Sequence, residues 1–265
     1  MLVLLAAFCL PLVTSGRLGE IFSWRWQPFD GKFGILPMCA GSLALSVAAL
    51  VLAFPLAIGL CALVHVLGRG WPARFWLVLI HFMTGIPTVV YGFVSVFLLV
   101  PRMRDWFQAG TGFSLLTAAL TMSLLILPTI VLVFQSRLDQ LDPMLRLSAE
   151  ALGFSRIQQM RYVLLPAASR GLAVAAVLGF GRAVGDTLIS LMLAGNAAQL
   201  PDSPVASIRT LTAQIALVLA TDSQSMAYQS VFAAGLLLFG LTAVVNLVLR
   251  GAGRRIKEPH RAQDI

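Results

Sequence analysis

The chain has 265 residues, of which 58% are hydrophobic and 11% are charged. A soluble globular domain typically carries about 25% charged residues, so this composition argues against a soluble enzyme and favours a protein that spans a lipid bilayer several times. The net charge of +8 comes from basic residues in short stretches between apolar runs. Nucleic-acid binding would need those charges gathered on one soluble face, so the sequence does not predict it.

Apolar stretches long enough to cross a bilayer as helices recur along the chain. They are residues 38–67, 75–100, 114–134, 171–195 and 229–249. Residues 1–14 are apolar but shorter than a full crossing, and we expect them to be the end of a first span. The sequence therefore predicts an all-α, polytopic membrane protein with about six transmembrane helices.

We expect three regions. Residues 1–36 form a partial first span and an outward interfacial segment, residues 37–250 form the transmembrane domain, and residues 251–265 form a basic tail. Arg and Lys are concentrated in residues 135–170 and after Arg250, and basic residues near membrane helices mark the cytoplasmic side. Residues 135–170 and the C-terminus are therefore predicted to face the cytoplasm.

Motifs for covalent chemistry are absent from the sequence. The three Cys and three His residues show no metal-ligand spacing, and no phosphate-binding loop, H-E-x-x-H or serine nucleophile motif occurs. We therefore expect no enzymatic activity, no cofactor and no metal site in this chain. If the protein moves a solute against its concentration gradient, a partner that binds ATP or an ion gradient must supply the energy.

Residues 135–170 are longer and more polar than a tether between neighbouring helices requires. A short amphipathic helix is predicted after Pro143, ending at Gly153, and a second short helix is predicted from Ser155 towards Pro166. A glycine at a helix end permits a sharp left-handed turn. The two helices can then project together from the membrane as one rigid element.

This stretch resembles the cytoplasmic signature of bacterial ABC-importer permeases, E-A-A-x-x-x-G-x(9)-I-x-L-P. Gly153 matches its glycine, residues 163–166 (VLLP) occupy the I-x-L-P positions, and Leu147 replaces its glutamate. The resemblance implies a type I ABC-importer permease fold in which residues 144–158 dock on an ATPase subunit. The residues that it marks for coupling are Leu147, Ser148, Ala149, Glu150, Gly153, Phe154 and Pro166.

Two opposite charges, Arg182 and Asp186, lie within the apolar stretch 171–195. Placing an ion in the hydrocarbon costs about 2.5 to 3.5 kcal/mol on insertion scales, so such residues usually pair or line a path. A separation of four residues on one continuous helix would put them within ion-pair reach. Gly181 and Gly185 bracket the pair in a G-x-x-x-G arrangement that favours close helix packing.

Two interpretations of this pair stay open. It is either a structural ion pair, or an anion site at which a substrate oxyanion binds Arg182 and displaces Asp186 from it. The planar guanidinium of arginine donates two parallel hydrogen bonds to an oxyanion, whereas an acidic neighbour suits an anion that still carries a proton, such as phosphate. Thr187 and Ser190 follow on the same predicted helix. They either line a polar path or bond back to the helix itself.

Residues 179–187 (GFGRAVGDT) resemble the G-R-A-x-G-E-T stretch of phosphate importer permeases, with Asp186 in place of the glutamate. Residues 85–101 and 209–220 resemble further segments of that subunit. The chain is thus similar to the permease subunit of a bacterial phosphate ABC importer, a binding-protein-dependent transport system inner-membrane component.

This resemblance implies import of inorganic phosphate across the bacterial cytoplasmic membrane. The implied partners are a second permease subunit in a hetero- or homodimer, two ABC ATPase subunits that bind the ATP, an extracytoplasmic phosphate-binding protein and the lipid bilayer. Two alternatives remain: the same class of importer carrying molybdate, sulfate or a phosphonate, and an ion-gradient-driven anion carrier or channel.

Overall fold

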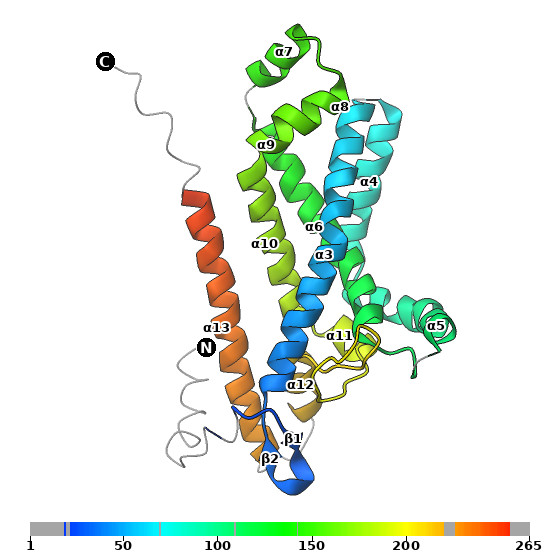
Figure 1. Cartoon of the computed structure of the whole chain (residues 1–265), viewed down its shortest axis with the longest axis vertical. Coiled ribbons are helices and arrows are strands. Elements are labelled where there is room, and N and C mark those ends of the chain that lie inside the picture. The colour runs from blue at the N-terminus through cyan, green and yellow to red at the C-terminus, as the bar shows by residue number, and fades with distance from the viewer. Residues whose placement is uncertain are drawn as a thin grey trace. The chain divides into compact units, whose positions relative to one another are not determined.

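The computed structural model describes residue 19 and residues 22–68, 70–108, 110–141, 143–219 and 226–254. Residues 1–14 and most of the tail 251–265 lie outside these ranges, so the expectations for a partial first span and a basic tail stay predictions. The described chain is almost entirely helical (Figure 1), which confirms the all-α prediction apart from one short β-hairpin.

The chain forms two compact units, each assembled from separated segments. The first unit comprises Met1–Ala49, Pro87–Met122 and Ala183–Val244, and the second comprises Leu50–Ile86, Ser123–Arg182 and Val245–Ile265. The long helices α3 (Leu36–Leu67), α6 (Leu115–Asp139) and α13 (Met226–Arg254) each contribute residues to both units.

The first unit begins with the hairpin. Strands β1 (Trp26–Gln27) and β2 (Lys32–Phe33) are antiparallel and flank the 3-10 turn η1 (Pro28–Asp30), with Trp26 opposite Phe33. The rings of Trp26 and Phe33 meet edge to face at 5.7 Å. Trp26 also packs against the buried residues Ile35 and Ala233, so the hairpin is fastened to α3 and α13 by apolar contact.

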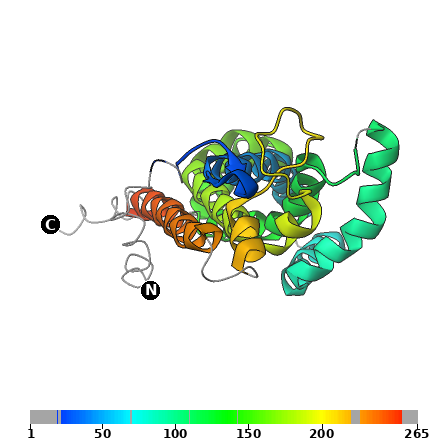
Figure 2. The ribbon, with the colours of Figure 1, turned by 90° about the horizontal axis from the view of Figure 1, so that it is seen from below.

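Figure 2 shows the hairpin and the connection between α11 (Leu188–Leu193) and α12 (Leu211–Leu219) at the near end of the first unit. The backbone N–H of Leu211 donates to Ser42 Oγ on α3 at 2.7 Å. Gly41 is required beside it, because a Cβ there would collide with the carbonyl oxygen of Arg209. Residues far apart in sequence thus hold the start of α12 against α3.

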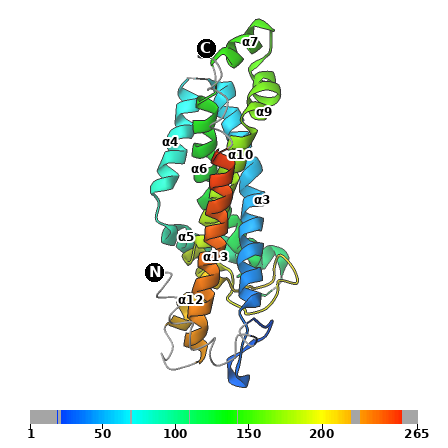
Figure 3. The same ribbon diagram turned by 90° about the vertical axis from the view of Figure 1, so that its left-hand side faces the viewer.

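In the second unit, small side chains on α3 face α6. Ala53, Ala57 and Cys61, spaced by four residues, are fully buried, and the Cys61 Sγ lies 3.7 Å from the carbonyl oxygen of Val131. Helix α6 and α10 (Ser169–Gly185) lie side by side (Figures 1 and 3), and a Cβ at Gly179 would press on Ile130. Small residues at these contacts let the helices approach closely. Close packing matters in a bilayer, because the hydrophobic effect does not drive helices together there.

The predicted spans at 38–67 and 114–134 are confirmed by α3 and α6, which are long and apolar enough to cross a membrane. The predicted span at 229–249 lies within α13, whose apolar part, Ser230–Val245, is shorter, so this span stays a prediction. The predicted span over 75–100 is not one continuous helix, since the chain forms α4 (Trp71–Gly85) and then α5 (Thr88–Phe107) with a bend of 99° between them. Ile86 is extended between them. Pro87 explains the break, because the residue before a proline is pushed out of the helical region.

The prediction of one continuous helix over 171–195 is wrong. Helix α10 ends at Gly185, and α11 begins only at Leu188. The glycines differ from expectation as well: Gly181 faces Val245 of α13, as close packing requires, whereas a Cβ at Gly185 would meet no atom within 4 Å. Gly181 and Gly185 therefore do not act together as one helix-packing motif.

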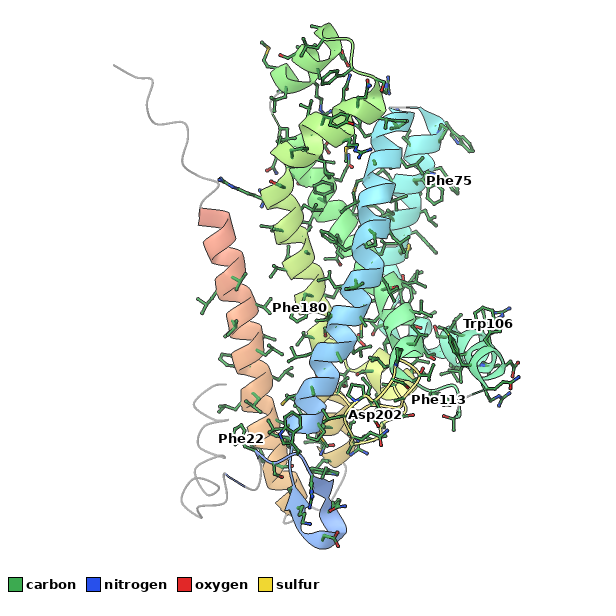
Figure 4. The ribbon with its side chains drawn as sticks, in the orientation of Figure 1. Phe22, Phe75, Trp106, Phe113, Phe180 and Asp202 are labelled. Atoms are coloured by element: carbon green, nitrogen blue, oxygen red, sulfur yellow. The ribbon has the colours of Figure 1, made fainter. Side chains whose placement is uncertain are left out.

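By length and composition, two described helices can each cross a membrane, α3 over Leu36–Val66 and α6 over Leu115–Asp139. The number rises to four when α4 with α5, and Arg156–Ala167 with α10, are each counted as one interrupted span. Exposed apolar side chains on α4, such as Phe75, point away from the neighbouring helices (Figure 4). Such surfaces suit contact with lipid.

Candidate functional site

The turn after α7 (Pro143–Ala151) has the backbone geometry of a Schellman motif. Gly153 adopts φ +76°, its N–H donates to the Glu150 carbonyl at 2.9 Å, and the Phe154 N–H donates to the Ala149 carbonyl at 3.0 Å. These two bonds satisfy carbonyls that a helix end otherwise leaves unpaired. The sequence prediction of a sharp left-handed turn at Gly153 is confirmed.

The next helix, α8 (Arg156–Gln158), starts at once with a capping box. The Gln158 N–H donates to Ser155 Oγ at 3.4 Å, and the Ser155 N–H donates to Gln158 Oε1 at 2.8 Å. Gln159, which is buried, donates its side-chain amide to the Phe154 carbonyl at 3.1 Å. The link between the two helices is therefore hydrogen-bonded at both ends, as a rigid projection requires.

The chain continues through the π-helical turn η2 (Gln159–Leu164) and α9 (Leu165–Ala167) before a bend of 74° into α10. In Figures 1 and 3, α7 lies at one extreme end of the second unit, beyond α8 and α9. The two short helices predicted from sequence are present. The π-helical turn was not predicted.

The projecting pair of helices carries apolar side chains on its surface. Met144, Leu147, Leu152 and Ile157 are each more than half exposed, whereas Met160 is buried. Scattered exposed apolar residues need no explanation, but a cluster of large ones on a short charged segment is typical of a contact surface. We call Met144, Leu147, Leu152 and Ile157 the apolar knob.

Two arginines tie this segment to the long helices of the same unit. Arg146 Nη2 donates to the carbonyl oxygen of Leu138 at 3.0 Å and lies 3.9 Å from Asp139, both at the end of α6. The guanidinium of Arg156 lies directly against Gly68, in the turn that follows α3. Both contacts therefore connect α7 and α8 to the ends of α6 and α3.

The structure places the predicted coupling residues unequally. Exposed members of the set are Leu147, Ser148, Glu150, Gly153, Phe154 and Pro166. Ala149 is buried, so it packs within the second unit rather than on its surface. Sequence reasoning missed the tether at Arg146 and the capping box at Ser155, although the S-x-x-Q spacing from Ser155 to Gln158 is a readable signal.

The predicted charge pair does not lie on one helix. Arg182 is an exposed residue near the end of α10 and closes the second unit, whereas Asp186 follows the end of that helix and belongs to the first. The Asp186 carboxylate accepts a hydrogen bond from the Ile189 N–H at 2.9 Å. Asp186 thus caps α11, and the helical spacing from which we predicted an ion pair with Arg182 does not apply.

In the first unit, hydroxyl groups gather around the segment that precedes α11. Ser190 is fully buried and donates to the Thr187 carbonyl at 2.9 Å, while Thr210 donates to Ser190 Oγ at 3.0 Å. Thr212 donates to the Asp186 carbonyl at 3.0 Å. The Ser190 hydroxyl therefore bonds back to its own chain, the more conservative of its two predicted roles.

Among the described residues, no group of three or more His, Cys, Asp and Glu side chains could hold a metal ion. Ion pairs of the described residues include Arg146 with Asp139 and Arg104 with Asp105, of which the second is exposed on α5.

Comparison with known families matches most of the chain. Residues 54–258, which include the projecting helices and α10, match the family described as binding-protein-dependent transport system inner membrane component. The chain is 35% identical over 238 residues to the probable ABC transporter permease protein YqgH of Bacillus subtilis, covering 89% of this chain and 77% of that protein. It is also 27% identical over 274 residues to the phosphate transport system permease protein PstC of Haemophilus influenzae, covering 94% and 87%.

Solved structures with similar folds include the MetNI methionine ABC transporter in an inward-facing conformation. The TM-score is 0.65 at 19% identity, and the match covers 86% of this chain and 99% of that one. A bacterial ABC transporter involved in the import of the acidic polysaccharide alginate matches with a TM-score of 0.63 at 18% identity, covering 96% of each chain. Likeness at this identity shows the fold alone, and it confirms the predicted type I fold.

The capping box yields a prediction for local stability. Replacing Ser155 with Ala removes the oxygen that accepts from Gln158, which costs about 1 kcal/mol at a helix start. We expect amide hydrogen exchange at residues 156–160 to accelerate about fivefold. Ser155→Asp keeps an acceptor at the cap and serves as the matched control with near-native exchange. Equal exchange in Ser155→Ala and the native protein would show that the cap does not hold the segment.

Proposed function

The chain belongs to the inner membrane components of binding-protein-dependent transport systems, the permease subunits of ABC importers, and from this premise we propose that its cargo is inorganic phosphate. Support for phosphate comes from the relatives named phosphate transport system permease protein, at 27% identity in Haemophilus influenzae and 28% in Pasteurella multocida. A cationic residue, Arg182, in an apolar membrane segment also suits an anionic cargo.

We infer that the chain works in a complex of several proteins. A second permease subunit, as a hetero- or homodimer, completes the pathway, two ABC ATPase subunits bind and hydrolyse ATP, and an extracytoplasmic phosphate-binding protein delivers the cargo. The permease itself then needs no cofactor and performs no covalent chemistry. Its site is the bacterial cytoplasmic membrane, with residues 135–170 and the C-terminus on the cytoplasmic side, because basic residues concentrate there.

The observation that carries the proposed importer function is the projecting pair of helices, α7 and α8. A positive φ at Gly153 and the capping box at Ser155 hold α7 and α8 together, and the apolar knob faces outward from them. The ATPase subunit docks here, burying the knob. When ATP closes the ATPase dimer, α7 moves and pulls the end of α6 through Arg146. The transmembrane helices then change between an outward-open and an inward-open arrangement.

Arg182 provides the anion contact along the path. It lies near the break between α10 and α11, and its planar guanidinium can donate two parallel bonds to a phosphate oxygen pair. Asp186 and Thr187 occupy the break itself, and the carboxylate of Asp186 is partly exposed. This carboxylate accepts a hydrogen bond from the hydroxyl group that phosphate still carries near neutral pH and that sulfate lacks.

The cargo is tested in liposomes that hold the permease pair and its ATPase subunits. We expect ATP hydrolysis to rise when phosphate-loaded binding protein is added outside, but not with sulfate or molybdate. If another oxyanion alone stimulated ATP hydrolysis, that oxyanion would be the cargo in place of phosphate. Phosphate uptake that survives ATP depletion and collapses with an ionophore would instead identify an ion-gradient-driven carrier, and would contradict the importer assignment.

The coupling role predicts the effect of Gly153→Val. A branched residue at φ +76° strains the turn even though the space beside Gly153 is open, so the angle between α7 and α8 should change. We expect at least a tenfold fall in phosphate moved per ATP hydrolysed, with the subunits still assembled. Gly240→Val, at a helical glycine of α13 with open space, is the matched control. An unchanged coupling ratio in Gly153→Val would contradict docking at this turn.

The anion contact predicts that Arg182→Lys lowers phosphate uptake about tenfold, because lysine keeps the charge but loses the two parallel donors. Arg102→Lys on α5, where the arginine bonds only the nearby Leu98 carbonyl in the described structure, should leave uptake unchanged. Full uptake by Arg182→Lys in reconstituted vesicles would show that a bidentate contact is not needed.

A further inference from the structure

The connection between α11 and α12 holds a second arginine in a defined position. Arg209 Nε donates to the carbonyl oxygen of Asn196 at 2.8 Å, and its Nη1 donates to Gln214 Oε1 at 3.0 Å. The backbone on either side is fixed too, because the Arg209 carbonyl lies against Gly41 and the Leu211 N–H bonds Ser42. The guanidinium is therefore oriented before any ligand arrives.

This guanidinium carries a charge that its neighbours do not balance. Burial lowers the pKa of Arg209, although an arginine stays protonated at neutral pH. In the ranges that the structure covers, no carboxylate lies within ion-pair distance of it, and its two bonded partners are neutral oxygens. Arginine has five N–H donors, so several remain for an anion.

Gln214 offers a further donor at the same place. The side chain is fully buried, its Oε1 accepts from Arg209, and its Nε2 has no hydrogen-bond partner. The bond from Arg209 settles which end of the amide is oxygen, so the unpaired atom is the donor nitrogen. A buried polar group without a partner is costly, and in native proteins it usually marks a function or a bound group.

An unsatisfied acceptor belongs to Asn196, whose backbone carbonyl already accepts from Arg209. Its Nδ2 donates to the Leu191 carbonyl at 2.7 Å, which leaves the buried Oδ1 without a partner. Asn196 also sits at φ +57°, a conformation that asparagine tolerates better than most residues. Both neutral partners of the Arg209 guanidinium thus carry a side-chain atom without a hydrogen bond.

We propose that Arg209, Gln214 and Asn196 form a second oxyanion site, which receives phosphate in the first unit before or after its contact with Arg182. Arg209 and Gln214 donate to the phosphate oxygens, and Asn196 Oδ1 accepts a hydrogen bond from a phosphate hydroxyl. The site deepens the proposed function, on which it rests. No covalent bond is made or broken there, so affinity comes from charge-assisted hydrogen bonds alone.

Hydrogen bonds connect this site to the break after α10. Thr210 and Thr212 flank Leu211, and they bond Ser190 and the Asp186 carbonyl respectively. The N–H of Ala213 donates to Thr210 Oγ1 at 3.1 Å, which caps α12. An anion at Arg209 therefore contacts a region that these hydrogen bonds hold in place, rather than a free loop.

Gln214→Glu separates an anion role from a structural one. The glutamate keeps an oxygen for Arg209 Nη1, but it replaces the amide donor with a negative charge that repels phosphate. Because it also supplies the missing countercharge for Arg209, the thermal midpoint of the assembled importer should not fall. Gln199→Glu is the matched control, since Gln199 is exposed on the same connection and bonds only Ser207 in the described structure.

The readouts are phosphate uptake and ATP hydrolysis in liposomes with saturating phosphate-loaded binding protein. We expect Gln214→Glu to lower uptake at least tenfold while stimulated ATP hydrolysis persists, and Gln199→Glu to match the native importer. Gln214→Met, which removes the donor without adding charge, should lower uptake in the same direction and decides the matter if the glutamate variant does not assemble.

Uptake within twofold of native in an assembled Gln214 variant overturns the second site. A parallel loss of uptake and stimulated ATP hydrolysis also overturns it, because that result indicates a contact with the binding protein instead of with phosphate. A native importer that moves no phosphate would refute the proposed cargo itself, so the two failures are distinguishable.

Discussion

The structure depends on how helices end in apolar surroundings. A helix end leaves backbone N–H and C=O groups unpaired, and where water is scarce the protein must supply their partners. In the apolar segments this chain does so with side chains: the Asp186 carboxylate accepts from the first turn of α11, and Thr210 caps α12. The exposed turn between α7 and α8 is closed in the same way, by the hydrogen bonds at Gly153 and Ser155.

The end of α7 shows how hydrogen bonds hold a turn in one geometry. The bonds at Gly153 and Ser155 fix the turn between α7 and α8, and the proposed coupling to an ATPase subunit depends on this rigidity. Arg146 and Arg156 then connect the segment to α6 and to the turn after α3. Small residues such as Ala57 and Gly179 keep these helices in close contact, so the second unit can move as a packed body.

The break between α10 and α11 serves a different purpose. It ends α10 at Gly185, three residues after Arg182, and the Thr212 hydroxyl of α12 satisfies the backbone carbonyl of Asp186 there. Side chains distant in sequence thus supply the hydrogen bonds that a continuous helix would have made within itself. Arg209 extends the same arrangement, because neutral carbonyls orient its charge and leave donors for an anion.

Much of the fold and part of the site followed from the sequence alone. Length and hydrophobicity located α3, α6 and α13 to within a few residues, since a bilayer demands long apolar helices. The turn at Gly153 was readable because glycine, amphipathic pattern and spacing are local properties. The unpartnered donor of Gln214 was not, and only the tertiary structure revealed it: its burial depends on segments such as Ser42 and Leu211, which are distant in sequence and meet only in the folded chain. The tertiary structure likewise decided where α10 ends, and so placed Arg182 in that helix and Asp186 after it, because a broken helix and a continuous one share the same hydrophobic pattern.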